Sequence, residues 1–228
     1  MSVKSLHTRH PRRYQENKFV YPVLSRRSPV RWVMLAAPFA SGVGIYTFYA
    51  LQPYLLELWG DPHAYQIAGL VAAIVAGAQI LGGLAAPRIR RRFRRRTSAL
   101  IATAALSSLT LALIGLVASF WVVVALIVVW GLLFAASRPI RQTYLNGLIP
   151  SRQRATILSF DSMMTSAGGV WAQPALGRAA DVWGYAPSYV MGAAISALAL
   201  PFLALSRRQN APADMVDVGD PRLASEAA

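Results

Sequence analysis

Residues 65–96 read YQIAGLVAAIVAGAQILGGLAAPRIRRRFRRR: 23 residues without a charged side chain, followed by seven arginines within nine positions. An apolar run of this length is close to the roughly 20 residues that a helix needs to cross the hydrocarbon core of a bilayer. Arginines directly after such a run resist translocation and hold that end of the helix in the cytoplasm. The stretch therefore predicts a membrane-spanning helix that ends on the cytoplasmic side.

The remainder of the chain repeats this alternation of apolar runs and basic connections. The apolar stretches that we expect to span the membrane are 30–53, 65–87, 98–118, 120–138, 155–177 and 187–206. Of the 23 Lys and Arg residues, 22 fall on one side of this topology, and Arg178 is the exception. This bias predicts that both ends of the chain are cytoplasmic. Helices are expected throughout, because each segment must satisfy its own backbone amides in lipid.

The composition of the 228 residues argues against several other classes of protein. Only 14% of the residues are charged, against about 25% in soluble domains. The net charge of +14 is located beside the spans, where it sets topology and meets lipid headgroups, so we do not expect nucleic-acid binding. The chain has no cysteine and only three scattered histidines. No catalytic motif, metal site or cofactor is predicted.

The sequence divides into three parts. Residues 1–29 are basic and contain three prolines, which is typical of a cytoplasmic arm resembling a linker. Residues 30–206 form the transmembrane domain, and residues 207–228 are polar and read as a disordered cytoplasmic tail.

Large polar side chains in four of the six spans mark a candidate cavity. Such groups at membrane depth usually face protein or water rather than lipid. The first, second, fourth and fifth spans are therefore expected to line the cavity, and the third and sixth to pack outside it. The alternative is hydrogen bonding between helices, at about 1 kcal/mol or less each. The candidate cavity residues are Tyr46, Tyr49, Gln52, Gln79 and Gln173.

Asp161 is the only acid inside a predicted span. An ionisable residue at this depth is a functional hypothesis by default, here as a carboxylate that couples transport to protons. The alternative is a structural ion pair with Arg154 or Arg138 near the start of the fifth span. Arg178 and Asp181 flank the outer end of the same span and are candidates for a gate or cap pair.

Two short segments suggest an internal repeat. Residues 83–87 (GLAAP) follow the second span and residues 177–181 (GRAAD) follow the fifth, 94 positions later. Three-helix units repeated with opposite topology are typical of transporters. We therefore expect an all-α, polytopic membrane protein with six transmembrane helices in a 3+3 inverted-repeat bundle.

Two stretches resemble the major facilitator superfamily. Residues 138–189 are similar to the region of its tenth to twelfth helices, and residues 82–96 to its basic loop between the eighth and ninth helices. The acid common in that loop is absent here, its position being Ala86 or Pro87. The resemblance covers about residues 18–206 and is carried by Tyr144-x-Asn146, Ile149-Pro150-x-x-x-Arg154-Ala155-Thr156 and Gly177-Arg178-x-x-Asp181-x-x-Gly184-Tyr185.

The resemblance implies a secondary active solute transporter that works by alternating access. It also implies that this chain corresponds to the C-terminal six-helix half of the twelve-helix family, as a half-length or truncated chain. Its expected partners are the lipid bilayer, an unidentified small-molecule substrate with a proton as candidate co-substrate, and a missing N-terminal half or a second copy. The expected location is the plasma (inner) membrane. The rival hypothesis is a non-transporting membrane scaffold or assembly subunit.

Overall fold

A computed structural model describes residues 28–216 of the chain. The basic arm predicted for residues 1–29 lies almost entirely outside the described residues, as does the tail beyond residue 216. The described part consists of helices and short connections, with an isolated β-bridge as its only strand-like pairing. Its helices are α2 (Pro29–Trp59), α3 (Tyr65–Arg92), α4 (Arg96–Leu116), α5 (Phe120–Leu148), α6 (Arg154–Trp183), α7 (Tyr185–Ala197) and α8 (Ala199–Arg208).

Five apolar stretches of the described residues are long enough to cross a membrane. They are α2, residues 65–89 of α3, α4, α5 and the combined α7 and α8, which are separated by Leu198 alone. The chain is therefore an integral, multi-pass membrane protein. The expected fifth span corresponds to α6, whose 30 residues are enough to cross a membrane but which falls outside this apolar set. Its mean hydropathy is lowered by charged and amide side chains, among them Asp161, Gln173 and Arg178.

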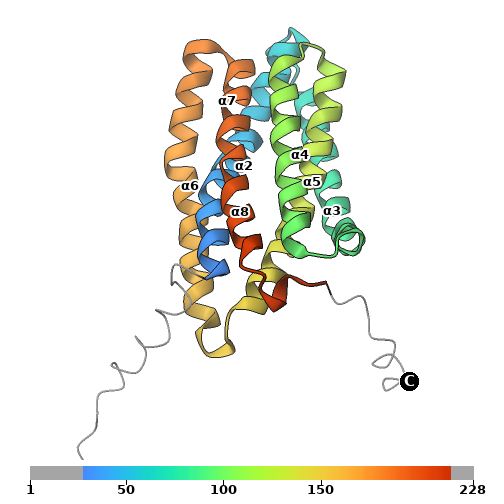
Figure 1. Cartoon of the computed structure of the whole chain (residues 1–228). Helices are drawn as coiled ribbons and strands as arrows, with labels where there is room; N and C mark the ends of the chain where they lie inside the picture. The colour runs from blue at the N-terminus through green and yellow to red at the C-terminus, as the bar shows by residue number, and fades with distance from the viewer. Residues whose placement is uncertain (1–27, 217–228) are drawn as a thin grey trace, which may run out of the picture.

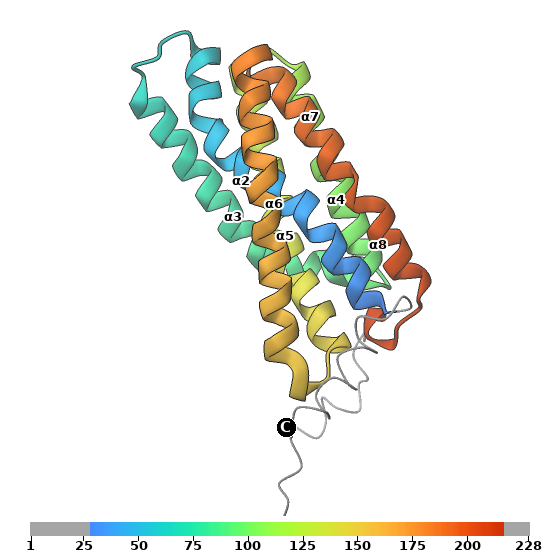
Figure 2. The same cartoon turned by 90° about the vertical axis from the view of Figure 1, so that its left-hand side faces the viewer.

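The helices form two layers. One layer contains α6, α2, α5 and α3 in that order, because α2 packs on α6, α5 packs on α3, and α2 also contacts α5. The second layer consists of α4 with α7 and α8, which cover one face of the central helices α2 and α5 (Figure 1). Figure 2 shows the layers edge-on, with α3 on one side and α4, α7 and α8 on the other. The opposite face of α2 and α5 is left without a covering helix in the described part of the chain.

Glycines set the closest approaches between helices. A Cβ atom added to Gly168 of α6 would lie 2.7 Å from the Cα of Pro38 in α2. A Cβ at Gly82 of α3 would lie 2.9 Å from the Cα of Leu132 in α5, and Gly115 of α4 meets the α7 backbone in the same way. Small residues allow helix backbones to pack this closely in a membrane. Each of the three main helix pairs therefore depends on a residue without a side chain.

The beginning of α2 and the end of α8 lie side by side. The Ser206 hydroxyl near the end of α8 donates to the carbonyl oxygen of Pro29 at 3.2 Å. The same hydroxyl lies 3.2 Å from that of Tyr144, near the end of α5. These contacts gather the two ends of the described chain and the end of α5 at one end of the bundle (Figure 1).

Residues 209–216 differ from the disordered tail expected from the sequence. They turn back from α8 and pack on the beginning of α4, where Asp214 is buried. The backbone N–H of Thr97 donates to the Asp214 carboxylate at 2.7 Å, and the Thr97 hydroxyl donates to it at 2.8 Å. The backbone N–H of Val216 donates to the carbonyl of Arg94 at 3.1 Å. Asp214 thus supplies the side-chain cap that Arg95, the residue at the cap position of α4, does not make.

Candidate functional site

Arg141 and Asp161 form a two-point ion pair between α5 and α6. The distances are 2.8 Å from Nη1 to Oδ2 and 2.5 Å from Nη2 to Oδ1. The Nη2 group also donates to the carbonyl oxygen of Val33 in α2, at 3.5 Å. The side chains are 26% and 11% exposed, respectively. Charge-assisted, two-point contacts of this kind are among the stronger polar interactions in proteins, so the pair ties together three helices.

The sequence placed the partner of Asp161 at Arg154 or Arg138, and the structure assigns it to Arg141. Arg154 lies seven residues earlier on the same helix, about 10 Å along the axis, and is exposed. Arg138 is exposed, and its guanidinium carbon lies 4.9 Å from the centroid of the Phe134 ring. Arg141 was expected in a loop after a span that ended at residue 138, but α5 continues to Leu148. The pairing of Arg141 with Asp161 could be recognised only once the full length of α5 was known.

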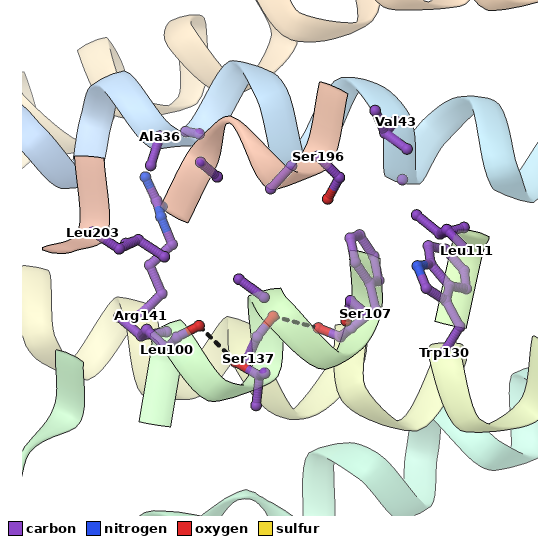
Figure 3. A pocket seen from close by; sticks show the side chains of 17 residues that line it. Ala36, Val43, Leu100, Ser107, Leu111, Trp130, Ser137, Arg141, Ser196 and Leu203 are labelled. Atoms are coloured by element: carbon purple, nitrogen blue, oxygen red, sulfur yellow. Dashed lines mark hydrogen bonds between the residues drawn. The ribbon is translucent and has the colours of Figure 1, made fainter. Parts of the chain in front are cut away.

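Arg141 also reaches across an internal cavity. The cavity lies between α2, α4, α5, α7 and α8, and its walls are mostly apolar apart from Arg141 and four hydroxyl groups, including those of Ser107, Ser137 and Ser196 (Figure 3). In Figure 3 the guanidinium of Arg141 extends from α5 towards Ala36 of α2. The volume is about 90 Å³. Small-molecule sites occupy about 300 Å³ or more, so this cavity is too small to be the place where a solute binds.

Tyr46 points into the bundle and belongs to a buried tyrosine cluster. Its hydroxyl lies 2.5 Å from that of Ser188 on α7. The ring centroid of Tyr189 is 6.1 Å from that of Tyr46 and 5.2 Å from that of Tyr54. The hydroxyls of Tyr189 and Tyr54 donate to backbone carbonyls on neighbouring helices, at 3.3 Å and 3.0 Å. Tyr46 therefore makes the interhelical hydrogen bond that was the alternative to a cavity-lining role.

Tyr49 and Gln52 have a different environment although they lie on the same helix. Both are exposed, and 69% of Tyr49 is accessible. The neighbours of α2 are α6, α7, α8, α5 and α3, so these two side chains occupy the part of its surface that none of them covers. Tyr49 lies ten residues before the end of α2 at Trp59, about 15 Å along the axis. An aromatic and an amide side chain are thus presented in the second half of an apolar span, ten and seven residues before the end of α2.

The remaining candidates lie on the outer helices of the same layer. Gln79 of α3 and Gln173 of α6 are half-buried; Gln79 packs beside Gly131 of α5, and Gln173 lies over Gly169 of its own helix. Arg178 and Asp181 are both exposed near the end of α6. In the described part of the chain, the ion pairs are Arg141–Asp161 and an exposed His63–Asp61 contact. The expected pairing of Arg178 with Asp181 is therefore not formed there.

The fold and these positions define a class of protein: a polytopic helical membrane protein with an uncovered helical face that carries polar groups. The family model of the Major Facilitator Superfamily matches residues 33–222. The chain therefore belongs to the major facilitator superfamily, whose members are membrane transporters. No protein of curated function matches the chain.

Proposed function

We propose that the chain forms one six-helix wall of a secondary active solute transporter that works by alternating access. In this proposal α6 is the sixth membrane span, and α2–α4 and α5–α8 are two three-helix units of opposite topology. The substrate site lies on the uncovered face of α2 and α5, facing a second six-helix wall.

The pattern of helix contacts supports the inverted repeat. The first helix of each unit packs on the second helix of the other, as α2 does on α6 and α5 on α3. The third members, α4 and α7, pack on each other. Gln79 and Gln173 occupy matching second helices 94 residues apart, the same spacing that separates Gly83 from Gly177. Exchange of partners between equivalent helices is what a pseudo-two-fold axis produces.

The observation that carries the substrate site is the exposure of Tyr49 and Gln52 in the second half of the apolar span α2. Polar groups at such a depth usually face protein or a water-filled path. The aromatic ring offers an apolar contact surface, and the amide offers two donors and an acceptor to an amphiphilic solute. Arg138, exposed beside Phe134 on α5, adds a positive charge on the neighbouring central helix, about 12 Å further along the bundle axis than Tyr49. These groups are suited to a small molecule with an apolar part and a polar or anionic group.

A single six-helix bundle supplies only one side of a solute path. The second wall is an N-terminal six-helix half or a second copy of the chain, and the membrane is the plasma membrane with both ends of the chain in the cytoplasm. The gathering of Pro29, Tyr144 and Ser206 at one end of the bundle supports this orientation, because that end also carries the arginine-rich α3–α4 connection. The Arg141–Asp161 pair acts as a clamp between α5, α6 and α2 near that end.

Cysteine labelling tests the uncovered face directly. The chain contains no cysteine, so single substitutions need no altered background. Tyr49→Cys and Gln52→Cys are compared with Leu106→Cys and Leu109→Cys, which replace exposed residues of α4 in the second layer. The proposal predicts that a membrane-impermeant maleimide labels positions 49 and 52 from one side of the membrane and spares the two leucine positions. Equal protection at all four positions supports a sealed bundle and the scaffold hypothesis.

A further inference from the structure

A second pocket lies between the beginning of α4 and the end of α8, on the layer opposite to the uncovered face. Its lining residues are Arg95, Ile101, Ala204, Arg207, Arg208 and Asn210. The volume is about 570 Å³, and the pocket is a wide-open surface groove rather than an enclosed cavity. It is separate from the internal cavity and from Tyr49 and Gln52.

The polar side of this pocket is formed by residues at the beginning of α4 and at the end of α8. Arg95 immediately precedes α4, whereas Arg207 and Arg208 form the last turn of α8. Nη1 of Arg95 donates to Oδ1 of Asn210 at 2.7 Å. Asn210 has a φ of 48°, the left-handed conformation that asparagine tolerates better than most residues. Its backbone N–H donates to the carbonyl of Arg207 at 3.2 Å, so the turn that ends α8 also places the amide beside Arg95.

The pocket has a charged end and an apolar end. Arg95, Arg207 and Arg208 contribute three guanidinium groups, and no lining residue is acidic. Guanidinium groups match the geometry of phosphate oxygens and bind them through two parallel N–H donors. Ile101 lies six residues after Arg95 along α4, and Ala204 lies three residues before Arg207 along α8. Both apolar residues are therefore displaced from the arginines towards the interior of the membrane.

We propose that this pocket binds the phosphate of an anionic phospholipid. The headgroup phosphate lies among the three arginines, and an acyl chain runs along Ile101 and Ala204 between α4 and α8. The charged end of the pocket matches the phosphate of a phospholipid, and the apolar end matches its acyl chain. Basic pockets between transmembrane helices at the cytoplasmic side are suited to such headgroups. The inference rests on the chain being a membrane protein with this end of the bundle in the cytoplasm, and it does not rest on the proposed solute transport.

Lipid retention by the full chain tests the proposal. The protein is purified in detergent, titrated with phosphatidylglycerol or with phosphatidylcholine of the same acyl chains, and bound lipid is measured by native mass spectrometry. The triple variant Arg95→Gln/Arg207→Gln/Arg208→Gln is compared with Arg88→Gln/Arg91→Gln/Arg92→Gln, which removes the same charge from the exposed end of α3. Loss of three nearby cations is expected to weaken phosphatidylglycerol binding about tenfold or more in the first variant. The control variant and all phosphatidylcholine measurements change little.

Three results would overturn the proposal. Equal loss in both triple variants assigns the effect to diffuse attraction by basic residues. Displacement of phosphatidylglycerol by millimolar inorganic phosphate assigns the pocket to a free anion rather than a lipid. If the triple variant loses its thermal unfolding transition, Arg207→Gln/Arg208→Gln replaces it, because this change leaves the Arg95–Asn210 contact intact. Unchanged phosphatidylglycerol binding in that folded double variant also contradicts the proposal.

Discussion

The guanidinium of Arg141 and the carboxylate of Asp161 meet through two contacts, at 2.8 Å and 2.5 Å, at the junction of α5, α6 and α2. Both charged groups are largely buried, and a buried charge without its partner is destabilising because its desolvation is not compensated. The pair therefore has two separable consequences: it holds α6 against the remainder of the bundle, and it places a guanidinium directly beside the only acid of the predicted spans.

Removing one member of this pair is expected to destabilise the protein more than removing both. Asp161→Asn or Arg141→Gln alone leaves a charge without its partner, at a cost of roughly 2–4 kcal/mol in the free energy of unfolding. The double variant Arg141→Gln/Asp161→Asn retains hydrogen-bonding groups without charge and is expected to recover most of that loss. Thermal unfolding in detergent measures the three variants side by side.

The same variants separate a structural role from proton coupling. If Asp161 is only a clamp, the double variant regains substrate flux together with stability. If Asp161 carries protons, the double variant is stable but its flux no longer responds to a proton gradient. An Asp161→Asn protein as stable as the unaltered chain would contradict the structural role.

Gly168 and Gly177 lie on the same helix and predict opposite effects of substitution by alanine. A Cβ at Gly168 overlaps the backbone of Pro38 in α2, whereas a Cβ at Gly177 meets no atom within 4 Å. Gly168→Ala is expected to force α6 away from α2, at a cost of about 1–3 kcal/mol. Gly177→Ala is expected to be neutral or to stabilise by up to about 1 kcal/mol through helix propensity. Thermal unfolding of the two variants tests this, and equal effects would argue against the close α2–α6 contact.

Tyr46 and Tyr49 form a matched pair for separating packing from substrate contact. Tyr46→Phe deletes the hydroxyl that lies 2.5 Å from Ser188, so stability is expected to fall by about 1 kcal/mol. Tyr49→Phe changes an exposed residue and is expected to leave unfolding unchanged. If Tyr49 contacts substrate through its hydroxyl, this variant raises the substrate concentration needed for half-maximal flux. Destabilisation by Tyr49→Phe, with no effect of Tyr46→Phe, would reverse these assignments.

Features that depend on local composition were predictable from the sequence. The apolar runs predicted α2, α3, α4, α5 and the combined α7 and α8. The motifs between residues 138 and 189 indicated the family to which the chain belongs. In contrast, the ends of the helices were not predictable from the sequence. α5 continues through Arg138 and Arg141 to Leu148, although the charges of this segment resemble those of a loop. The identity of the ion pair followed from that helix end and was missed with it.

The direction in which polar side chains point around a helix also could not be predicted from the sequence. Tyr46, Tyr49 and Gln52 looked equivalent, because the full circumference of α2 is apolar enough to contact either lipid or protein. Packing against α7 decides that Tyr46 is buried, and the absence of a covering helix within the described residues leaves Tyr49 exposed. Likewise, nothing in the polar composition of residues 209–216 indicated that Thr97, more than 100 positions earlier, offers Asp214 two hydrogen bonds.

The contact between Asp214 and Thr97 predicts that the chain after α8 contributes to stability. Truncation after Arg208 removes the cap of α4 and its side-chain hydrogen bonds, and it is expected to lower the free energy of unfolding by about 1–2 kcal/mol. Truncation after Val216 retains these contacts and serves as the control. Asp214→Ala is expected to reproduce most of the loss, while Asp214→Asn, which keeps an acceptor oxygen, loses less. Thermal unfolding of the four proteins measures the effect, and the rate of proteolysis near residue 210 gives a second measure for the three proteins that retain this segment. Similar stability of both truncated proteins would show that the segment packs on α4 without supporting it.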